Sequence, residues 1–189
     1  MKVTLKFVSV LDACEIIEQS RPMKTVVVIL GASASGKSYL RQSLCKGEPV
    51  KCGTPMCRYT LYDNAGCVGT HNGGADKVGD NKSTLDGIFQ AIRDVLIERD
   101  VCIVEGQVPT NSYKAIAAFL FPKSLRVVIH WHNPDEATNL QRLHDRSAKH
   151  GRVPKPSAIK RILAARRALP GKMEWLKENY PPFEYQEHP

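Results

Sequence analysis

The sequence predicts an α/β fold in three layers, with a mostly parallel central sheet covered by helices on both faces. Apolar runs rich in β-branched residues alternate along the chain with amphipathic helical patterns, as in α/β proteins. These runs lack the alternating polar residues of a strand with one wet face, which is typical of parallel strands covered on both sides. The 189 residues contain no repeat or linker, so we expect one domain spanning residues 1–189.

The first buried strand leads into a glycine-rich segment. Residues 26–30 read VVVIL, residues 31–38 read GASASGKS, and YLRQSLC follows as a predicted helix with Leu40 and Leu44 four positions apart on one side. A strand, a glycine-rich turn and a helix N-terminus form a cradle for anions. Backbone N–H groups point into such a turn, and the helix dipole favours negative charge there.

The middle of the chain predicts a hairpin and an amphipathic helix. Residues 47–57 are expected to form a loop, and 58–70 an antiparallel hairpin that turns at 64–66. A polar, glycine-rich loop follows, and Ser83 begins the next helix with Asp86 in a capping box. The apolar positions of this helix recur at helical spacing: Leu85, Ile88, Phe89, Ile92, Val95 and Leu96.

The second half of the chain continues the alternation of strands and helices. We expect a strand that ends at Glu105, a helix at 112–120, a strand at 124–132, and helices at 135–149 and 156–169. No further strand is evident after these helices. In a parallel sheet of this kind the ligand is expected at the carboxyl ends of the strands.

The glycine-rich segment fits the motif G-x-x-x-x-G-K-[ST], which predicts a nucleotide-binding loop. In such a loop Lys37 contacts the β- and γ-phosphates during catalysis, and the Ser38 hydroxyl joins the shell of a Mg²⁺ ion. Glu105 stands at the end of an apolar strand, where a second metal-binding acid is expected; alternatively it is a loop carboxylate paired with a lysine. The predicted cofactors are ATP and Mg²⁺. The predicted cofactor-binding residues of the loop are Gly31, Ala32, Ser33, Ala34, Ser35, Gly36, Lys37 and Ser38.

A GTPase is disfavoured by the rest of the sequence. Asp63 and Gly66 fit the short pattern D-x-x-G, which arises easily in a turn. The guanine-reading pattern N-K-x-D fails, because Asn81-Lys82-Ser83-Thr84 ends without an aspartate.

Arginines suited to a transferring phosphoryl group follow the strand at 124–132. Arg142 and Arg146 lie four positions apart on one helix face, and Arg152 follows in the adjoining loop. This segment resembles the lid of P-loop nucleoside and nucleotide kinases, in which arginines spaced R-x3-R close on ATP. The resemblance covers about residues 25–152. It implies a P-loop kinase-like fold with an arginine-bearing lid at about 139–155, in which Arg142, Arg146 and Arg152 bind ATP and the first two act in catalysis.

The same resemblance implies a carboxylate that orients and deprotonates an acceptor hydroxyl. Asp76, in the polar loop that follows the hairpin, is the first candidate, and Asp63, at the hairpin turn, is the second. Aspartate is also a common residue in turns, so both could have an ordinary structural role. Lys77 could contact an acceptor phosphate. Tyr59 and Tyr62 could stack on a base, although tyrosines in strands commonly pack in the core.

Positive charge is concentrated late in the chain. Residues 142–172 contain ten Lys or Arg and one acid, a local charge of +9, whereas the whole chain carries +8. Such a patch suits polyanions, or it is a solvated surface. In the basic helix at about 156–169, we expect one apolar face to dock on the sheet and Arg166 to fall within it. The apolar face comprises Ile159, Ile162, Leu163 and Leu169, and the basic residues outside it are Lys160, Arg161 and Arg167.

The predicted function is an ATP-dependent phosphotransferase that moves the γ-phosphate to a hydroxyl of a nucleotide-like acceptor. The looping segment at 69–79, GTHNGGADKVG, and the compact size of the chain are similar to those of bacteriophage P-loop kinases, some of which phosphorylate 5-hydroxymethyluracil in DNA during thymidine hypermodification. The favoured acceptor is therefore the 5-hydroxymethyl group of a pyrimidine in DNA. Two alternatives stay open: a kinase of free deoxynucleoside monophosphates or nucleosides, and a nucleotide-dependent nucleic-acid-binding module without transferase activity.

The sequence also bears on location. No apolar run approaches the roughly 20 residues of a membrane span. Residues 1–20 start basic but soon include acids, and they are expected to form a strand and a short helix rather than a signal peptide. We expect a cytoplasmic protein, in the host cytoplasm if it is phage-encoded. The sequence leaves the oligomeric state open.

Overall fold

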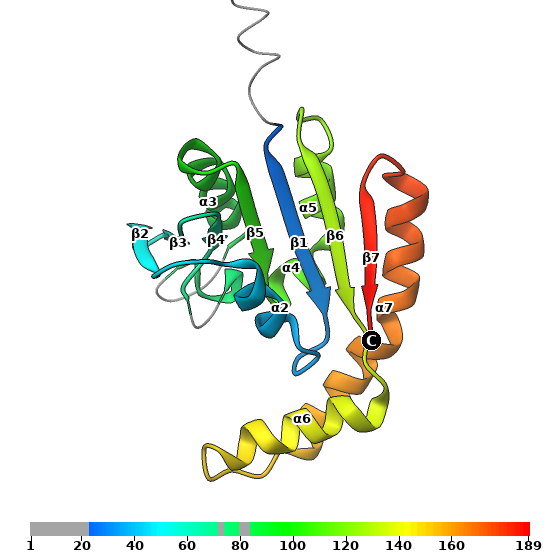
Figure 1. Cartoon of the computed structure of the whole chain (residues 1–189). Helices are drawn as coiled ribbons and strands as arrows, with labels where there is room; N and C mark the ends of the chain where they lie inside the picture. Colours follow the sequence, from blue (N-terminus) through cyan, green and yellow to red (C-terminus); the bar gives the residue numbers. More distant parts are fainter. Residues whose placement is uncertain (1–22, 72–73, 80–83) are drawn as a thin grey trace, which may run out of the picture.

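The computed structural model describes residues 23–71, 74–79 and 84–189. Within them the chain forms an α/β fold whose seven-stranded, mostly parallel sheet is flanked by helices (Figure 1). The strand and helix expected in residues 1–20 lie outside the described residues, as does Ser83. The predicted capping box is wrong in its first member, because Thr84 caps the helix and accepts a hydrogen bond from the N–H of Gly87 at 3.1 Å.

The sheet has the order β2-β3-β4-β5-β1-β6-β7. Strands β4, β5, β1, β6 and β7 run parallel to one another, whereas β3 pairs antiparallel with both β2 and β4. The predicted hairpin is thereby confirmed as β3 and β4. The strands are β1 (Thr25–Gly31), β2 (Val50–Thr54), β3 (Cys57–Leu61), β4 (Gly66–Val68), β5 (Val101–Glu105), β6 (Arg126–His132) and β7 (Glu184–His188).

Helices cover both faces of the sheet. The three-residue turn η1 (Ala75–Lys77) follows β4. The α-helices are α2 (Lys37–Leu44), α3 (Leu85–Glu98), α4 (Gln107–Asn111), α5 (Tyr113–Leu120), α6 (Glu136–Ala148) and α7 (Pro156–Asn179). No helix among the described residues is both long enough and apolar enough to cross a membrane.

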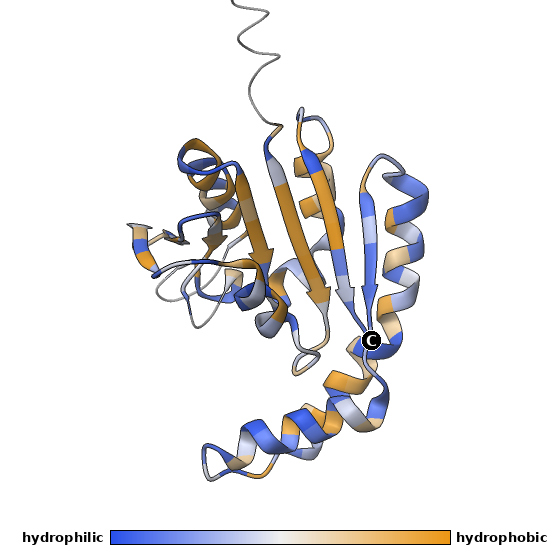
Figure 2. Cartoon of the chain, viewed as in Figure 1, coloured by the Kyte–Doolittle hydropathy of each residue, from blue (hydrophilic) through white to orange (hydrophobic). Residues whose placement is uncertain are grey.

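Two packed clusters hold these layers together. On one face the β-branched residues of the sheet pack against apolar side chains of α3, α5 and α7, such as Ile92, Ile116 and Met173. On the other face Ile29 and Ile103 pack against α2. The apolar strands therefore stand out in the middle of the sheet in Figure 2, as expected for strands with no wet face.

Two expectations about strands are corrected. The predicted loop at 47–57 contains β2, because its backbone pairs with β3 from Val50↔Leu61 to Thr54↔Cys57. A further strand does follow the helices, since β7 pairs with β6 along its whole length. Its sequence, EYQEH, is polar because β7 is an edge strand, so it carries no apolar signal.

The last helix is longer than predicted and divides its packing between two partners. It continues through Pro170 to Asn179, and its second half packs on the sheet through Leu169 and Met173. Its first half does not dock on the sheet as expected, because Ile162 packs instead against Leu143 of α6 and Ala32. Together α6 and this first half project beyond the carboxyl ends of the parallel strands (Figure 1).

Candidate functional site

The glycine-rich loop leaves the carboxyl end of β1 and enters α2. Gly36 is the N-cap of α2 and has φ 113°, a left-handed conformation that favours glycine. A Cβ at Gly36 would lie 3.2 Å from Nη1 of Arg142, so the loop and α6 approach one another closely here. The first N–H groups of α2 have no intrahelical acceptor. They lie beside the pocket, which suits a bound anion.

Lys37 begins α2 and is buried, with only 6% of its surface exposed. Its ammonium donates to the carbonyl oxygens of Gly31 at 2.9 Å and Ala32 at 2.7 Å. Burial lowers the pKa of Lys37, and the carboxylates of Glu105 and Asp76 oppose that shift. An ammonium has three protons, so one remains for an anion in the pocket.

Ser38 and Glu105 meet across the neighbouring strands β1 and β5. The Ser38 hydroxyl lies 3.3 Å from Oε1 of Glu105. The other carboxylate oxygen lies 3.9 Å from Nε of Arg41, a guanidinium that is 2% exposed. The alternative reading of Glu105 expected a lysine as its ion-pair partner, whereas the ion pair in the described part of the chain is with this arginine. A hydroxyl and a carboxylate side by side are the oxygen ligands that Mg²⁺ prefers.

Helix α6 reaches back over the glycine-rich loop. Arg142 donates to the carbonyl oxygen of Ser35 at 2.6 Å, and Arg146 donates to the Ser33 hydroxyl at 3.1 Å. Asn139, which is fully buried, holds the carbonyl oxygen of Ser33 at 3.1 Å. Two cationic side chains of α6 are thereby brought to the loop. Arg152 is exposed and does not line the pocket, so it is not part of this cluster.

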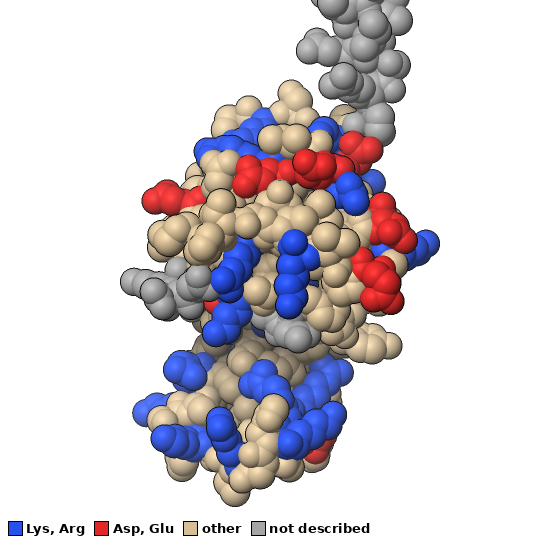
Figure 3. All heavy atoms as spheres, turned by 90° about the vertical axis from the view of Figure 1, so that its left-hand side faces the viewer, with Lys and Arg blue, Asp and Glu red and all other residues tan. Residues whose placement is uncertain are grey.

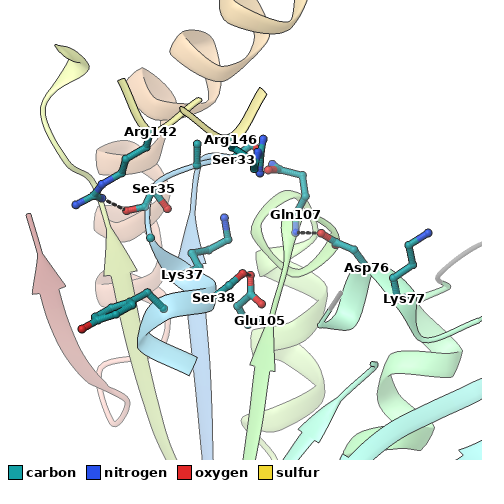
Figure 4. A pocket seen from close by; sticks show the side chains of 13 residues that line it. Ser33, Ser35, Lys37, Ser38, Asp76, Lys77, Glu105, Gln107, Arg142 and Arg146 are labelled. Carbon is teal, nitrogen blue, oxygen red and sulfur yellow. Dashed lines mark hydrogen bonds between the residues drawn. The ribbon is translucent and has the colours of Figure 1, made fainter. Parts of the chain in front are cut away.

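These groups enclose a pocket of about 480 Å³ at the carboxyl ends of β1 and β5. In Figure 4 the side chains of Lys37, Ser38 and Glu105 form one side and those of Asp76, Lys77 and Gln107 come from the neighbouring segments, while Arg142 and Arg146 lie across the loop. Four cations and two carboxylates therefore line the pocket, an imbalance that favours an anionic ligand.

Asp76 lies in this pocket, and its two carboxylate oxygens accept hydrogen bonds from the backbone of α4. The N–H groups of Gln107 and Val108 each donate to it at 2.7 Å. The approach is tight, because a Cβ at Gly106 would lie 2.6 Å from Oδ1 of Asp76. Asp76 therefore joins η1 to the end of β5 and has a fixed orientation toward the pocket.

Asp63, the second candidate for the acceptor-side carboxylate, lies at the opposite end of the sheet. The register pairs Gly66 with Cys102, near the start of β5, whereas Glu105 ends that strand beside the pocket. The hairpin turn precedes Gly66, so it faces away from the glycine-rich loop. Asp63 is therefore not part of this site.

The two tyrosines of the hairpin do not line the pocket. Tyr62 is 5% exposed, and its hydroxyl lies 2.6 Å from Nδ1 of His71. Burial raises the pKa of Tyr62 to about 12. Tyr59 packs against the main core. Both tyrosines therefore pack within the fold, as tyrosines in strands commonly do, and neither is placed to stack on a base in this pocket.

Three histidines meet where β6 and β7 end, next to the same loop. The rings of His132 and His188 stack with centroids 4.7 Å apart, and Nδ1 of His130 lies 2.7 Å from Nε2 of His188. Burial, together with the neighbouring His188 and Lys37, lowers the pKa of His132 to about 4. A neutral imidazole therefore faces the loop at ordinary pH.

Sequence reasoning missed three residues that hold the site in shape. Gln107 lines the pocket, Asn139 supports Ser33, and the Thr110 hydroxyl lies 3.2 Å from the backbone nitrogen of Gly31. Their signals in the sequence are weak, because each is a single polar residue in a short or largely polar helix and belongs to no motif. The position of Gln107 just after the apolar strand that ends at Glu105 was a better signal, because ligands gather at the carboxyl ends of parallel strands.

Comparison of the sequence with models of known protein families, and with well-characterised individual proteins, finds no match.

Proposed function

We propose that this protein is a P-loop kinase that transfers the γ-phosphate of ATP to a hydroxyl of a nucleotide-like acceptor. In this proposal the glycine-rich loop binds the phosphates, and α6 with its arginines is the lid. The layered α/β fold around the loop is compatible with this class. The observation that carries the proposal is the meeting of Ser38 and Glu105, 3.3 Å apart, beside the buried Lys37.

The residues of the pocket fit a magnesium–nucleotide complex. Gly36 leaves no room for a Cβ without pressing on Arg142, so backbone N–H groups can approach a phosphate closely there. Ser38 and Glu105 are the residues that would hold Mg²⁺ or its water. When bound, the ion would neutralise part of the negative charge on the phosphates.

The remaining groups can stabilise the transferring phosphoryl group. Lys37 would exchange its bonds to the loop carbonyls for the β- and γ-phosphates. Arg142 and Arg146 would neutralise charge that spreads over the phosphoryl oxygens. The acceptor oxygen forms a bond to the γ-phosphorus, the bond from that phosphorus to ADP breaks, and the acceptor proton passes to a nearby carboxylate.

Asp76 is the residue proposed to receive that proton. Each carboxylate oxygen has two lone pairs, so the two hydrogen bonds from α4 leave acceptor capacity on the pocket side. The favoured acceptor is the 5-hydroxymethyl group of a pyrimidine in DNA. The exposure of Lys160, Arg161 and Arg167 supports a polyanionic acceptor, because exposed cations are available to phosphates.

Transfer of label from ATP tests the proposal. The protein is incubated with γ-labelled ATP and duplex DNA containing 5-hydroxymethyluracil, with a panel of free nucleosides and deoxynucleoside monophosphates, or with no acceptor. We expect label on the duplex and loss of that transfer in Lys37→Ala, because the lysine contacts charge concentrated on the phosphates in the transition state. Label on a free nucleotide alone assigns the small-molecule kinase instead.

The other class of protein gives a different result. A nucleotide-dependent binding module would bind ATP and DNA but move no label to any acceptor. Near-normal transfer by a Lys37→Ala protein with an unchanged circular dichroism spectrum would refute the kinase assignment.

A further inference from the structure

Two free thiols meet on the face of the sheet that α2 covers. The Sγ atom of Cys45 lies 3.3 Å from the Sγ atom of Cys67. Cys45 is the C-cap of α2, whereas Cys67 is the middle residue of β4. The two sulfur atoms are thus already in contact, and a short approach of one side chain would bring them to bonding distance.

The backbone on both sides of Cys45 is held against the hairpin turn. The side chain of Asn64 donates to the carbonyl oxygen of Leu44 at 2.9 Å and accepts from the N–H of Lys46 at 2.7 Å. The N–H of Asp63 donates to the carbonyl oxygen of Lys46 at 3.0 Å. These hydrogen bonds flank Cys45, so the position of its thiol follows from the fold.

The other thiol is fixed by the sheet. Cys67 pairs with Ile103 of β5, and it is fully buried in the apolar cluster beneath α2. Cys45 packs against the same cluster but is only half-buried. A small solute can therefore reach Cys45 from solution, whereas Cys67 is shielded from it.

The surroundings of Cys45 favour its thiolate. The thiol of Cys67 donates a hydrogen bond to it, and the guanidinium of Arg41, four positions earlier in α2, adds positive charge. Together they lower the pKa of Cys45 against the opposing effect of burial. The same hydrogen bond and burial raise the pKa of Cys67. Because the thiolate is the reactive form of cysteine, Cys45 is the nucleophile of the pair.

Positive charge also extends over the surface on the β2 side of the molecule. Figure 3 views the molecule from this side and shows Lys and Arg side chains over the sheet region and on the projecting part formed by α6 and the start of α7. The acidic side chains in this view gather mainly above them. A positive surface adds to the local effect of Arg41, because it favours an anionic thiolate over a neutral thiol.

The other cysteines of the described segments lack these features. Cys102 is fully buried and packs on the opposite face of the sheet. The thiol of Cys57 lies 3.4 Å from a carboxylate oxygen, and burial together with that carboxylate raises its pKa to about 11. The thiol of Cys52 donates to a backbone carbonyl oxygen. Among the described cysteines, two thiols therefore contact one another only at Cys45 and Cys67.

We propose that Cys45 and Cys67 are a peroxide-sensitive thiol pair that forms a reversible disulfide. The Cys45 thiolate attacks one oxygen of hydrogen peroxide, the O–O bond breaks, and a sulfenic acid and a hydroxide ion form. The sulfur of Cys67 then attacks the sulfur of Cys45, so that the S–S bond forms and the S–O bond breaks. The two thiol protons leave in two molecules of water, and the two electrons that the sulfur atoms lose reduce the peroxide.

The link would tie the end of α2 to β4, across 22 positions of the chain. The same helix begins with Lys37 at the glycine-rich loop, so its two ends would be a nucleotide-binding element and a redox site. Neither cysteine lines the pocket at that loop. The inference goes beyond the proposed kinase activity and does not depend on it.

The test detects the link itself. The reduced protein is treated with hydrogen peroxide, its remaining thiols are blocked with iodoacetamide in urea, and it is digested with trypsin without reductant. Cleavage after Lys and Arg places Cys45 in the peptide 42–46 and Cys67 in the peptide 59–77, so the linked pair has its own mass. Cys45→Ser is the test variant. Cys52→Ser is the matched control, because it removes another half-buried thiol.

We expect most wild-type chains to contain the linked peptides after treatment and to migrate as monomers on a non-reducing gel. Dithiothreitol should restore both free peptides, because a dithiol reduces a disulfide by exchange. Cys52→Ser should form the link as the wild type does, and Cys45→Ser should form none.

The proposal is overturned if the wild type forms no linked peptides, whether Cys45 stays reduced or is oxidised further to the sulfinic acid. It is also overturned if Cys45 pairs with a different cysteine, or if the link joins two chains. These results come from the wild type, so they stand even where a variant fails to fold. Label transfer from ATP is measured separately, and its failure would leave this result unchanged.

Discussion

The hydroxyl of Ser38 lies 3.3 Å from a carboxylate oxygen of Glu105, although 67 positions separate the two residues in the sequence. The contact exists because β1 and β5 are parallel neighbours and both end at the same edge of the sheet, with Ile29 paired to Glu105. Glu105 is 6% exposed and forms an ion pair with Arg41 at 3.9 Å. A buried carboxylate needs such compensation, and a metal ion would supply more of it.

Replacing Glu105 with Gln should weaken the dependence of transfer on Mg²⁺ while sparing nucleotide binding. The amide keeps the shape of the side chain but removes the charge that would hold the ion or its water. The measurement is the initial rate of label transfer over a Mg²⁺ titration, with ATP binding followed separately. An unchanged titration curve would mean that the metal acid lies elsewhere.

Replacing Asp76 with Asn should lower turnover by about 10²–10⁴-fold if this residue takes the acceptor proton. Because the carboxylate also holds two N–H groups of α4, we expect a lower melting temperature as well. Affinity for ATP should change little, since the residue is proposed to act on the acceptor.

Turnover measured well below the melting temperature separates these two effects of Asp76. There the folded Asn variant should still turn over far more slowly than the wild type, because an amide cannot accept the acceptor proton. An Asn variant that keeps the wild-type turnover at that temperature and loses only thermal stability would assign Asp76 a purely structural role.

Stability should fall in mild acid because of the histidines beside β7. Burial, together with His188 and Lys37, holds the pKa of His132 at about 4, against 6.5 for an ordinary histidine. Between these two values the unfolded chain binds a proton that the folded chain does not. The free energy of unfolding therefore increases as pH rises from about 4 to 6.5 and decreases as pH falls through the same range.

The variant His132→Asn should show a shallower loss of stability between about pH 6.5 and pH 4. Urea unfolding at several pH values measures it, with the exposed His144→Asn as the control. Equal slopes in the wild type and His132→Asn would contradict the assignment.

Much of the central sheet could be predicted from the sequence because its strands are buried on both faces. Residues 26–30 and 101–104 are apolar without interruption for that reason, and the glycine-rich segment between a strand and a helix was identifiable by its spacing alone. The edge strands β2 and β7 were not, because an edge strand can be polar throughout. Their pairing is decided by partners distant in sequence.

The site was predictable where a motif supplied the spacing and was not where the fold alone supplied it. Lys37, Ser38 and Glu105 come together as their positions at strand ends imply. Asp63 could not be judged without the register, which places its turn at the other end of β5. The support that Thr110 gives to Gly31 follows from a contact across 79 positions and leaves no pattern in the sequence.

If the acceptor is DNA, as proposed, replacing Lys160, Arg161 and Arg167 with glutamine should flatten the salt dependence of DNA binding. All three are exposed, and Arg167 forms a solvent-accessible ion pair with Glu136 at 3.7 Å. Arg166 is different, because it donates to the carbonyl oxygen of Pro134 and is left in place. Each phosphate contact contributes about −0.9 to the slope of log affinity against log salt, so the slope should shrink by up to that amount per residue.

The matched control replaces Lys46, Arg93 and Lys114 with glutamine, which removes the same charge from exposed residues elsewhere on the surface. Affinity for free ATP should hardly change in either variant, since Arg142 and Arg146 remain. The measurement is fluorescence anisotropy of a labelled duplex at several salt concentrations. If the α7 variant keeps both the wild-type slope and full activity on DNA, these residues are a solvated surface, and phosphorylation of a free nucleotide becomes the better proposal.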